Sequence, residues 1–137
     1  MMQRILVGTD TTAAADLAVD AAADLAMTYG AELLVLHVRD GTGVREAIDP
    51  SKRPDPDGYL AGMSGRFPSL KVRSWSERGE PGERLCDVAA EERADALVVG
   101  NRGAQGSRWR AHESVPSFVL RRSPCSVFVV DTRAAQR

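Results

Sequence analysis

ALVVGNRGAQGSRWRAHESVPSFVLRRSPCSVFVV, residues 96–130, is the stretch of the sequence that decides the fold. An apolar run ends at Gly100, a segment that contains Gly103 follows, and a helix-start signal around Ser114 leads to a second apolar run, Val127 to Val130. This pattern predicts a strand–loop–helix–strand unit. Sheets built from such units bind ligands at the carboxyl ends of their strands, and backbone N–H groups at a helix start can receive an anion. Phosphate binding is therefore the first function to test.

Length and composition are those of one globular domain. The chain has 137 residues, of which 43% are hydrophobic and 27% charged, and its formal net charge is −1. We treat residues 1–137 as a single domain and expect no nucleic-acid partner. We also expect no membrane partner, because no apolar run approaches the ~20 residues that a bilayer requires. The chain enters its first strand within a few residues of Met1, so we expect no signal peptide.

The two cysteines, Cys86 and Cys125, fit neither a metal-binding nor a redox spacing. With so few thiols in a chain of this size, we expect both to be reduced and the protein to be cytoplasmic. Cys125 is expected to be a small packed residue. His37 lies within an apolar run and is expected to be packed there. No cluster of His, Cys and acidic residues has metal spacing, so we expect no metal ion.

Charge is distributed unevenly along the sequence. Residues 1–100 hold 11 basic and 17 acidic residues, whereas residues 101–137 hold seven arginines and two acids. Five of these arginines gather near the glycine-containing segment: Arg102, Arg108, Arg110, Arg121 and Arg122. Two interpretations remain open, a solvated helix face and a patch that faces a bound anion.

The first forty residues predict a strand, a helix and a second strand. Arg4 to Gly8 is a short apolar run, as in a central parallel strand that is buried on both faces. The alanine-rich stretch 13–29 has helical spacing, with Thr12 placed to cap its start and Gly30 its end. We expect the apolar face of this helix to carry Leu17, Ala21, Leu25 and Thr28. The apolar run Glu32 to Val38 predicts the second strand.

Residues 41–69 give the weakest pattern. Five glycines and four prolines interrupt this segment, so we expect an irregular insertion with at most a short helix, around Tyr59 to Met63. Beyond it, Lys71 to Glu77 alternates as a strand near a sheet edge does. Gly79 to Gly82 then starts a helix, with a proline in its first turn. The fourth strand is expected at Ala96 to Gly100.

This order of elements predicts an α/β fold, an open parallel sheet with right-handed crossovers and helices on both faces. In such a sheet the ligand crevice lies where the strand order reverses, here between the first and fourth strands. The loops 8–12 and 100–107 are expected to meet at that point.

Taken together, these motifs resemble the universal stress protein family. The matching stretches occur in the same order as in the family: ILVGTD at 5–10, YGAEL at 29–33, LLVLHV at 33–38, GEP at 79–81, ADALVVGNRG at 94–103 and RRSPCSVFVV at 121–130. The resemblance implies a five-stranded sheet in the order 3-2-1-4-5, a Rossmann-like fold of the adenine nucleotide alpha hydrolase type. It also implies a homodimer that pairs through the last strand, here Ser126 to Val130.

Many members of this family bind ATP or a related adenine nucleotide through Gly-x-x-Gly, nine residues, and then Gly-Ser or Gly-Thr. Gly100 and Gly103 match the first half, and Ser114 supplies the expected hydroxyl, but Glu113 stands where the family has the last glycine. Two like charges about 4 Å apart cost up to ~4 kcal/mol at a surface-like dielectric, which is roughly a thousandfold in affinity. A carboxylate in the first turn of a helix also favours the helix dipole, so Glu113 is hypothesised to replace the external anion.

By the same resemblance, a bound nucleotide contacts eight residues: Thr9, Asp10, Val38, Val99, Gly100, Gly103, Ser114 and Val115. The Asp-Gly-Ser that commonly follows the first strand in the family is Asp10-Thr11-Thr12 here. A plainer interpretation remains open, in which Gly100 only turns the chain and Asp10 only hydrogen-bonds its own loop.

These observations favour a stress-response regulatory or binding module that is not an enzyme, with a degenerate adenine-nucleotide pocket that binds ATP weakly or not at all. Two alternatives remain open. One is an ATP-binding member with slow ATP hydrolysis, in which Asp10, Ser114 and the arginines orient a phosphate, and the other is a purely structural interaction module. The sequence has no Gly-x-x-x-x-Gly-Lys-Ser/Thr loop and no Gly-x-Gly-x-x-Gly after its first strand, which argues against P-loop enzymes and dinucleotide dehydrogenases.

Overall fold

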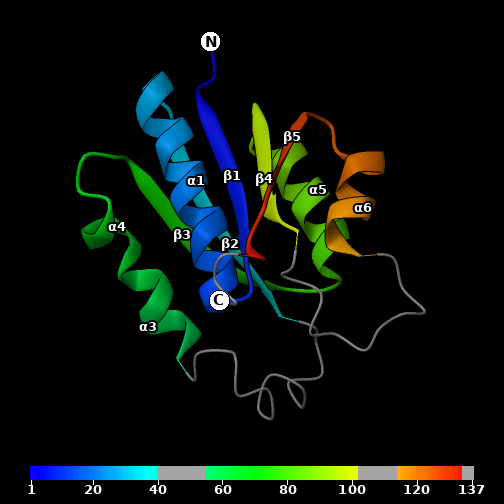
Figure 1. Cartoon of the computed structure of the whole chain (residues 1–137), viewed down its shortest axis with the longest axis horizontal. Coiled ribbons are helices and arrows are strands. Elements are labelled where there is room, and N and C mark those ends of the chain that lie inside the picture. The colour runs from blue at the N-terminus through cyan, green and yellow to red at the C-terminus, as the bar shows by residue number, and fades with distance from the viewer. Residues whose placement is uncertain (40–54, 102–113, 134–137) are drawn as a thin grey trace.

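The computed structural model describes residues 1–39, 55–101 and 114–133. In chain order the elements are β1 (Arg4–Thr9), α1 (Ala13–Tyr29), β2 (Glu32–Arg39), α3 (Pro56–Ala61), α4 (Met63–Arg66), β3 (Val72–Arg78), α5 (Pro81–Glu91), β4 (Ala96–Gly100), α6 (Val115–Arg122) and β5 (Ser126–Val130). The five strands pair in parallel in the order β3-β2-β1-β4-β5. The predicted fold class and strand order are confirmed (Figure 1).

Two hydrophobic cores lie on opposite faces of the sheet. Successive side chains of a strand point to opposite faces, so in β1 Ile5 and Val7 enter the core under α1, and Leu6 enters the core under α5 and α6. The same alternation holds in β2 and β4. Continuous apolar runs therefore give three central strands that are buried on both sides, as the sequence predicts.

Helix α1 begins and ends where the sequence predicts. The Thr12 hydroxyl accepts a hydrogen bond from the third residue of the helix, and Gly30 closes the helix in a left-handed conformation, with φ of 66°. The predicted apolar face is wrong, because the buried residues of α1 are Ala15, Ala18, Val19, Ala22, Ala23 and Ala26. Small side chains let the helix lie close to the sheet. The larger Leu25 packs at the border of this core, and Leu17 is half-buried.

The crossover from β2 to β3 contains two short helices, α3 and α4, instead of the one short helix expected around Tyr59 to Met63. Leu60, Met63 and Phe67 enter the core that α1 covers. Polar contacts add to this packing, since Arg66 pairs with Asp16 and Asp20 of α1. The breakers in this segment therefore divide a helical crossover into short pieces. The part of the expected insertion at 40–54 lies outside the described residues.

Helices α5 and α6 cover the other face. Helix α5 begins with a proline at its first position, as predicted, and the carboxylate of Glu80 accepts a hydrogen bond from the backbone N–H of Glu83. Helix α6 begins at the cap residue Ser114, also as predicted. Within the described ranges, no helix is long and apolar enough to cross a membrane.

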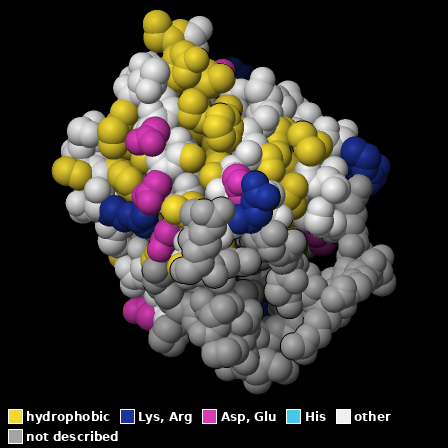
Figure 2. Space-filling model, viewed as in Figure 1, with side chains coloured by type: hydrophobic (Ala, Val, Ile, Leu, Met, Phe, Trp, Pro, Cys, Tyr) yellow, Lys and Arg dark blue, Asp and Glu magenta, His cyan; other side chains and the backbone are white. Residues whose placement is uncertain are grey.

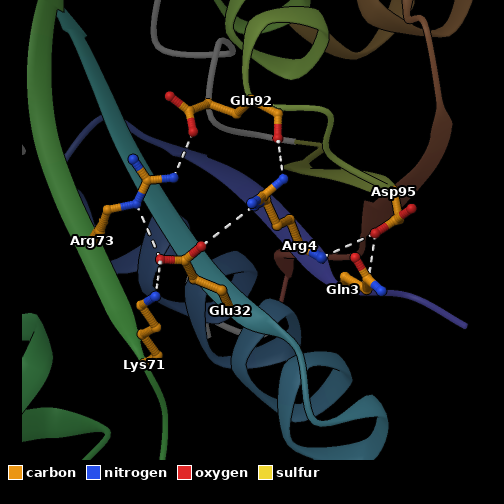
Figure 3. Close-up of polar contacts among 7 residues, drawn as sticks. All are labelled: Gln3, Arg4, Glu32, Lys71, Arg73, Glu92 and Asp95. Atoms are coloured by element: carbon orange, nitrogen blue, oxygen red, sulfur yellow. Dashed lines mark hydrogen bonds and ion pairs between the residues drawn. The ribbon is translucent and has the colours of Figure 1, made fainter.

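An ion-pair network joins the strands at their amino ends. The carboxylate of Glu32 is only 11% exposed and pairs with Arg73 at 3.1 Å, Arg4 at 3.5 Å and Lys71 at 3.9 Å. Arg73 also pairs with Glu92 at the end of α5 (Figure 3). The network therefore links β1, β2, β3 and α5 at the amino edge of the sheet.

Candidate functional site

The carboxyl ends of β2, β1 and β4 lie next to one another, because these strands are neighbours in the sheet (Figure 1). This edge brings together Thr9 at the end of β1, Val38 near the end of β2 and Gly100 at the end of β4. The strand order reverses here, since β1 pairs with β2 on one side and with β4 on the other. Sequence-predicted residues from three separate segments thus meet where doubly wound sheets bind ligands.

The loop from β1 to α1 is held by its own side chains. Oδ1 of Asp10 accepts hydrogen bonds from the backbone N of Thr12 at 3.1 Å and from its hydroxyl at 2.6 Å. Oγ1 of Thr9 accepts from the backbone N of Thr11 at 3.0 Å. Asp10 therefore hydrogen-bonds its own loop, as the plainer interpretation of the sequence predicts. Its other oxygen, Oδ2, takes no hydrogen bond from the residues that the structure describes.

Thr11 adopts a backbone conformation that suits glycine. Its φ is 69°, and its side chain is 1% exposed. A β-branched residue at positive φ is a genuine outlier, and such strain persists only where the surrounding structure holds it. The loop between Asp10 and Thr12 therefore keeps a glycine-like path although threonine replaces the glycine that relatives commonly have.

Three of the predicted contact residues are core residues by their side chains. Val99 is buried in the core under α5 and α6, and Val38 and Val115 pack against the same core at its border. A ligand at this edge would meet the backbone of Val99 rather than its side chain. The apolar pattern of the sequence indicates these positions, but it does not distinguish packing in the core from contact with a ligand.

Ser114 is the N-cap of α6. Its hydroxyl oxygen accepts a hydrogen bond from the backbone N of Ser117 at 3.3 Å, and the two hydroxyls lie 3.0 Å apart. The serine is exposed, so it is accessible to solvent at the start of an eight-residue helix. The N-terminus of α6 provides a partial positive charge for an anion.

The arginines do not all lie near this edge. Arg121 and Arg122 are in the last turn of α6, about 10 Å along the helix axis from its start. The two arginines thus lie at the opposite end of α6 from its cap residue, Ser114. Their expected gathering near the glycine-containing segment stays a prediction, because residues 102–113 lie outside the described residues. Arg122 lies over the Phe118 ring, 5.1 Å from its centroid.

Several sequence-based expectations fall outside the described residues. Gly103, Glu113, and the arginines at positions 102, 108 and 110 belong to residues 102–113. The contribution of Gly103 to the site and the effect of Glu113 stay predictions.

Sequence reasoning missed two residues beside Gly100. Asn101, which follows β4, accepts two hydrogen bonds from Thr132, which follows β5. A weak signal was available, since each is a polar residue just beyond an apolar strand. Their contact joins positions 31 apart, and only the sheet order brings these positions together.

The remaining titratable candidates are packed. His37 is buried, with Nδ1 3.1 Å from the Ser76 hydroxyl, as predicted. Both cysteines are free thiols, and burial raises the pKa of the Cys86 thiol, which disfavours the nucleophilic thiolate. In the part of the chain that is described, no group of three or more His, Cys, Asp or Glu residues could hold a metal ion.

A hollow of about 610 Å³ lies at the opposite, amino edge of the sheet, beside Met27, Leu70 and Lys71. Its cationic side chains, Arg4 and Lys71, already pair with Glu32. We therefore place the candidate site at the carboxyl edge and not in this hollow.

Comparison with known proteins identifies the family of the chain. Residues 1–131 match the universal stress protein family. The chain is 32% identical over 136 residues to a universal stress protein of Mycolicibacterium smegmatis, a match that covers 94% of this chain and 46% of the relative. The chain spans about half the length, or less, of the curated relatives it matches.

Solved structures give the same result. A universal stress protein in complex with cAMP is similar with a TM-score of 0.74 and 28% identity, over 96% of this chain and 98% of that one. A universal stress protein from Archaeoglobus fulgidus is similar with a TM-score of 0.72 and 28% identity, over 94% of this chain and 44% of that one.

Proposed function

The chain belongs to the universal stress protein family, and on that premise we propose that it is a stress-response binding module that senses an adenine nucleotide and is not an enzyme. The pocket lies at the carboxyl edge of β2, β1 and β4. One observation carries the proposal: Thr9, Asp10, Val38 and Gly100, predicted from separate segments, gather at this edge. The structural relative in complex with cAMP supports an adenine nucleotide as the ligand class.

The retained backbone of the first loop supports a working pocket. Thr11 holds a glycine-like φ of 69°, although this conformation costs a non-glycine residue about 1–2 kcal/mol. Oδ2 of Asp10 remains an acceptor for an amino or hydroxyl group. Adenine and ribose both offer such donors, so this end of the pocket suits a nucleoside.

The phosphate end of the pocket is the degenerate part. Glu113 directly precedes the N-cap Ser114, where the family has a glycine that lets phosphates approach the backbone. A carboxylate there opposes the charge of the ligand by up to ~4 kcal/mol if the two lie about 4 Å apart. We therefore propose weak binding, with affinity falling as the ligand carries more phosphate charge.

The experiment is a titration of adenosine, cAMP and ATP into the protein, followed by ¹H–¹⁵N NMR. We expect shifts for Asp10 and Gly100 with cAMP and weaker binding for ATP. Glu113→Gly should tighten ATP binding at least about tenfold, since it removes both bulk and charge. Glu113→Gln keeps the bulk and removes the charge, so equal gains from both variants assign the effect to charge.

No shift with any of the three ligands in wild type and in Glu113→Gly would refute the nucleotide pocket and leave a purely structural module. Steady phosphate release from ATP by the purified protein would instead favour slow hydrolysis. The two free thiols support a reducing, cytoplasmic setting for either activity.

We further propose that two copies pair through β5. Both β3 and β5 are edge strands. Strand β3 carries Arg73, Glu77 and Arg78, and charged residues protect an edge from pairing. Strand β5 (SVFVV) carries no charge, and Phe128 is 47% exposed. Figure 2 shows hydrophobic side chains at the surface on this face of the molecule.

A further inference from the structure

Thr132 is completely buried although it lies two residues beyond β5. Its exposed fraction is 0%, and a buried polar side chain needs hydrogen-bond partners. Asn101 supplies them, because its Oδ1 accepts hydrogen bonds from the backbone N and from Oγ1 of Thr132, each at 3.1 Å. The chain after the last strand is thus tied to the first residue after β4.

The same threonine fills the space beside Gly100. A Cβ added to Gly100 would lie 2.8 Å from Cγ2 of Thr132 and 3.7 Å from Cβ of Ala18 in α1. Gly100 therefore lacks a side chain where Thr132 packs against it. Thr132 therefore contacts both residues at which the chain leaves β4. It packs against Gly100 and donates hydrogen bonds to Asn101.

A third hydrogen bond completes this contact. The backbone N of Asn101 donates to the carbonyl of Val130 at 2.9 Å, directly after the last pair of the β4–β5 ladder. Figure 1 shows the carboxyl ends of β4 and β5 side by side. The direction in which the chain leaves β4 is therefore fixed from the side of β5.

We propose that Thr132 is a positioning residue for the phosphate end of the nucleotide pocket. It acts through Gly100 and Asn101 and touches no ligand itself, and the inference rests on the proposed function. The nucleoside end is held separately, since Asp10 belongs to the loop after β1 and Val38 to β2. Loss of the Thr132 hydroxyl therefore weakens ligands that carry phosphate and leaves adenosine binding unchanged.

The test compares Thr132→Val with Thr132→Ser. Valine keeps the branched shape against Gly100 and loses the hydroxyl, whereas serine keeps the hydroxyl and loses the methyl group. Affinities for ATP and for adenosine are measured by NMR titration. We expect Thr132→Val to weaken ATP about threefold to tenfold, the range that one lost hydrogen bond supports, with adenosine changed less than about twofold. Thr132→Ser keeps the hydrogen bond to Asn101 and loses only the methyl group beside Gly100, so it should lower the ratio of ATP affinity to adenosine affinity less than Thr132→Val does.

Asn101→Ala gives a second route to the same answer. This change removes the acceptor of both hydrogen bonds from Thr132. It should therefore lower the ratio of ATP affinity to adenosine affinity at least as much as Thr132→Val does, and the double variant should lower it no further than Asn101→Ala alone. Thermal unfolding shows that each variant is folded at the titration temperature.

The inference is overturned if Thr132→Val leaves ATP affinity unchanged, or if it weakens ATP and adenosine equally, as a general loss of fold would. In either case the proposed nucleotide pocket stands. If neither wild type nor Glu113→Gly binds adenosine, cAMP or ATP, the proposed function fails and this inference fails with it.

Discussion

Phe118 of α6 lies against the bare backbone of Gly82 in α5. A Cβ at Gly82 would lie 2.8 Å from Cδ1, 2.9 Å from Cγ and 3.2 Å from Cβ of Phe118. Because these atoms include Cβ of Phe118, a change of side-chain rotamer cannot relieve the clash, and α6 itself would have to move. Because Ser114 caps α6, this contact also sets where the start of α6 lies relative to the sheet.

We expect Gly82→Ala to lower the free energy of unfolding by about 1–3 kcal/mol, the usual cost of overpacking. In a helix without such a contact, alanine stabilises relative to glycine by about 0.5–1 kcal/mol. Gly65 in α4 is the matched control, because a Cβ added there would have nothing within 4 Å, so Gly65→Ala should be neutral or stabilising. Urea unfolding of both variants decides the sign, and a Gly82→Ala protein as stable as wild type contradicts the close contact.

The amino-edge network should depend on Glu32. Glu32→Gln removes the ion-pair partner of Arg4 and Lys71 and one of the two ion-pair partners of Arg73. Since the carboxylate is 11% exposed, we expect a loss of about 1–3 kcal/mol in urea unfolding, the range for a mostly buried charged partner. Asp57→Asn removes the charge of a carboxylate that is 79% exposed and pairs with Arg39, so it should give no resolvable change. Equal effects of the two variants would show that the network adds nothing beyond a surface pair.

The strands and helix boundaries could be predicted because local signals determine them. Apolar runs give β1, β2 and β4, and caps such as Thr12 and Ser114 fix where helices begin. The buried face of α1 could not be predicted in the same way. Hydrophobic spacing gives weight to large residues such as Leu17, while close packing against the sheet selects alanines.

For the candidate site, the sequence predicts which residues lie at the carboxyl ends of neighbouring strands. Thr9, Val38 and Gly100 meet because parallel strands bring their carboxyl ends to one edge. The contact of Thr132 with Gly100 depends on how two loops pass each other, and no spacing in the sequence encodes that. Sequence separation alone likewise could not place Arg121, which the helix carries to the opposite end of α6 from Ser114.

Asp95 gives the protein a pH dependence at its amino edge. Its Oδ2 accepts hydrogen bonds from the backbone N of Gln3 at 2.6 Å and of Arg4 at 3.0 Å. These bonds lower the pKa of the Asp95 carboxyl below its usual value, and the bond from Gln3 has the larger effect. A depressed folded-state pKa stabilises the fold above the unfolded-state value, about 3.9, and this stabilisation is lost as pH falls through the folded-state pKa.

We therefore expect Asp95→Ala to be less stable than wild type by about 1 kcal/mol at pH 7, after allowance for partial exposure. The difference should shrink below about pH 4. Asp95→Asn keeps an acceptor without the charge, so its stability should lie between those of wild type and Asp95→Ala. Urea unfolding from pH 2 to pH 7 measures this, and a difference between wild type and Asp95→Ala that stays constant with pH would argue against the assignment.

The strain at Thr11 can be isolated by comparing two replacements. Thr11→Gly and Thr11→Ala both remove the side-chain contacts, and only glycine also relieves a φ of 69°. We expect the glycine variant to be more stable than the alanine variant by about 1 kcal/mol, the reverse of the usual order. Thermal unfolding of the pair measures the difference. An alanine variant of equal or greater stability would mean that the loop does not keep its left-handed turn in solution.

Pairing of two copies through β5 predicts that a charge at Phe128 dissociates the dimer. Phe128 and Met27 are equally exposed, at 47% each, but Phe128 lies on the uncharged edge strand and Met27 in the last turn of α1. Phe128→Lys should raise the dimer dissociation constant at least about tenfold, because a lysine at a paired edge opposes strand addition. Met27→Lys adds the same charge and should leave the constant unchanged. Sedimentation equilibrium over a concentration series measures both, with thermal unfolding as the control for folding. A wild-type protein that stays monomeric at every concentration would refute the dimer. A Phe128→Lys protein that pairs as wild type does would place the interface on another surface.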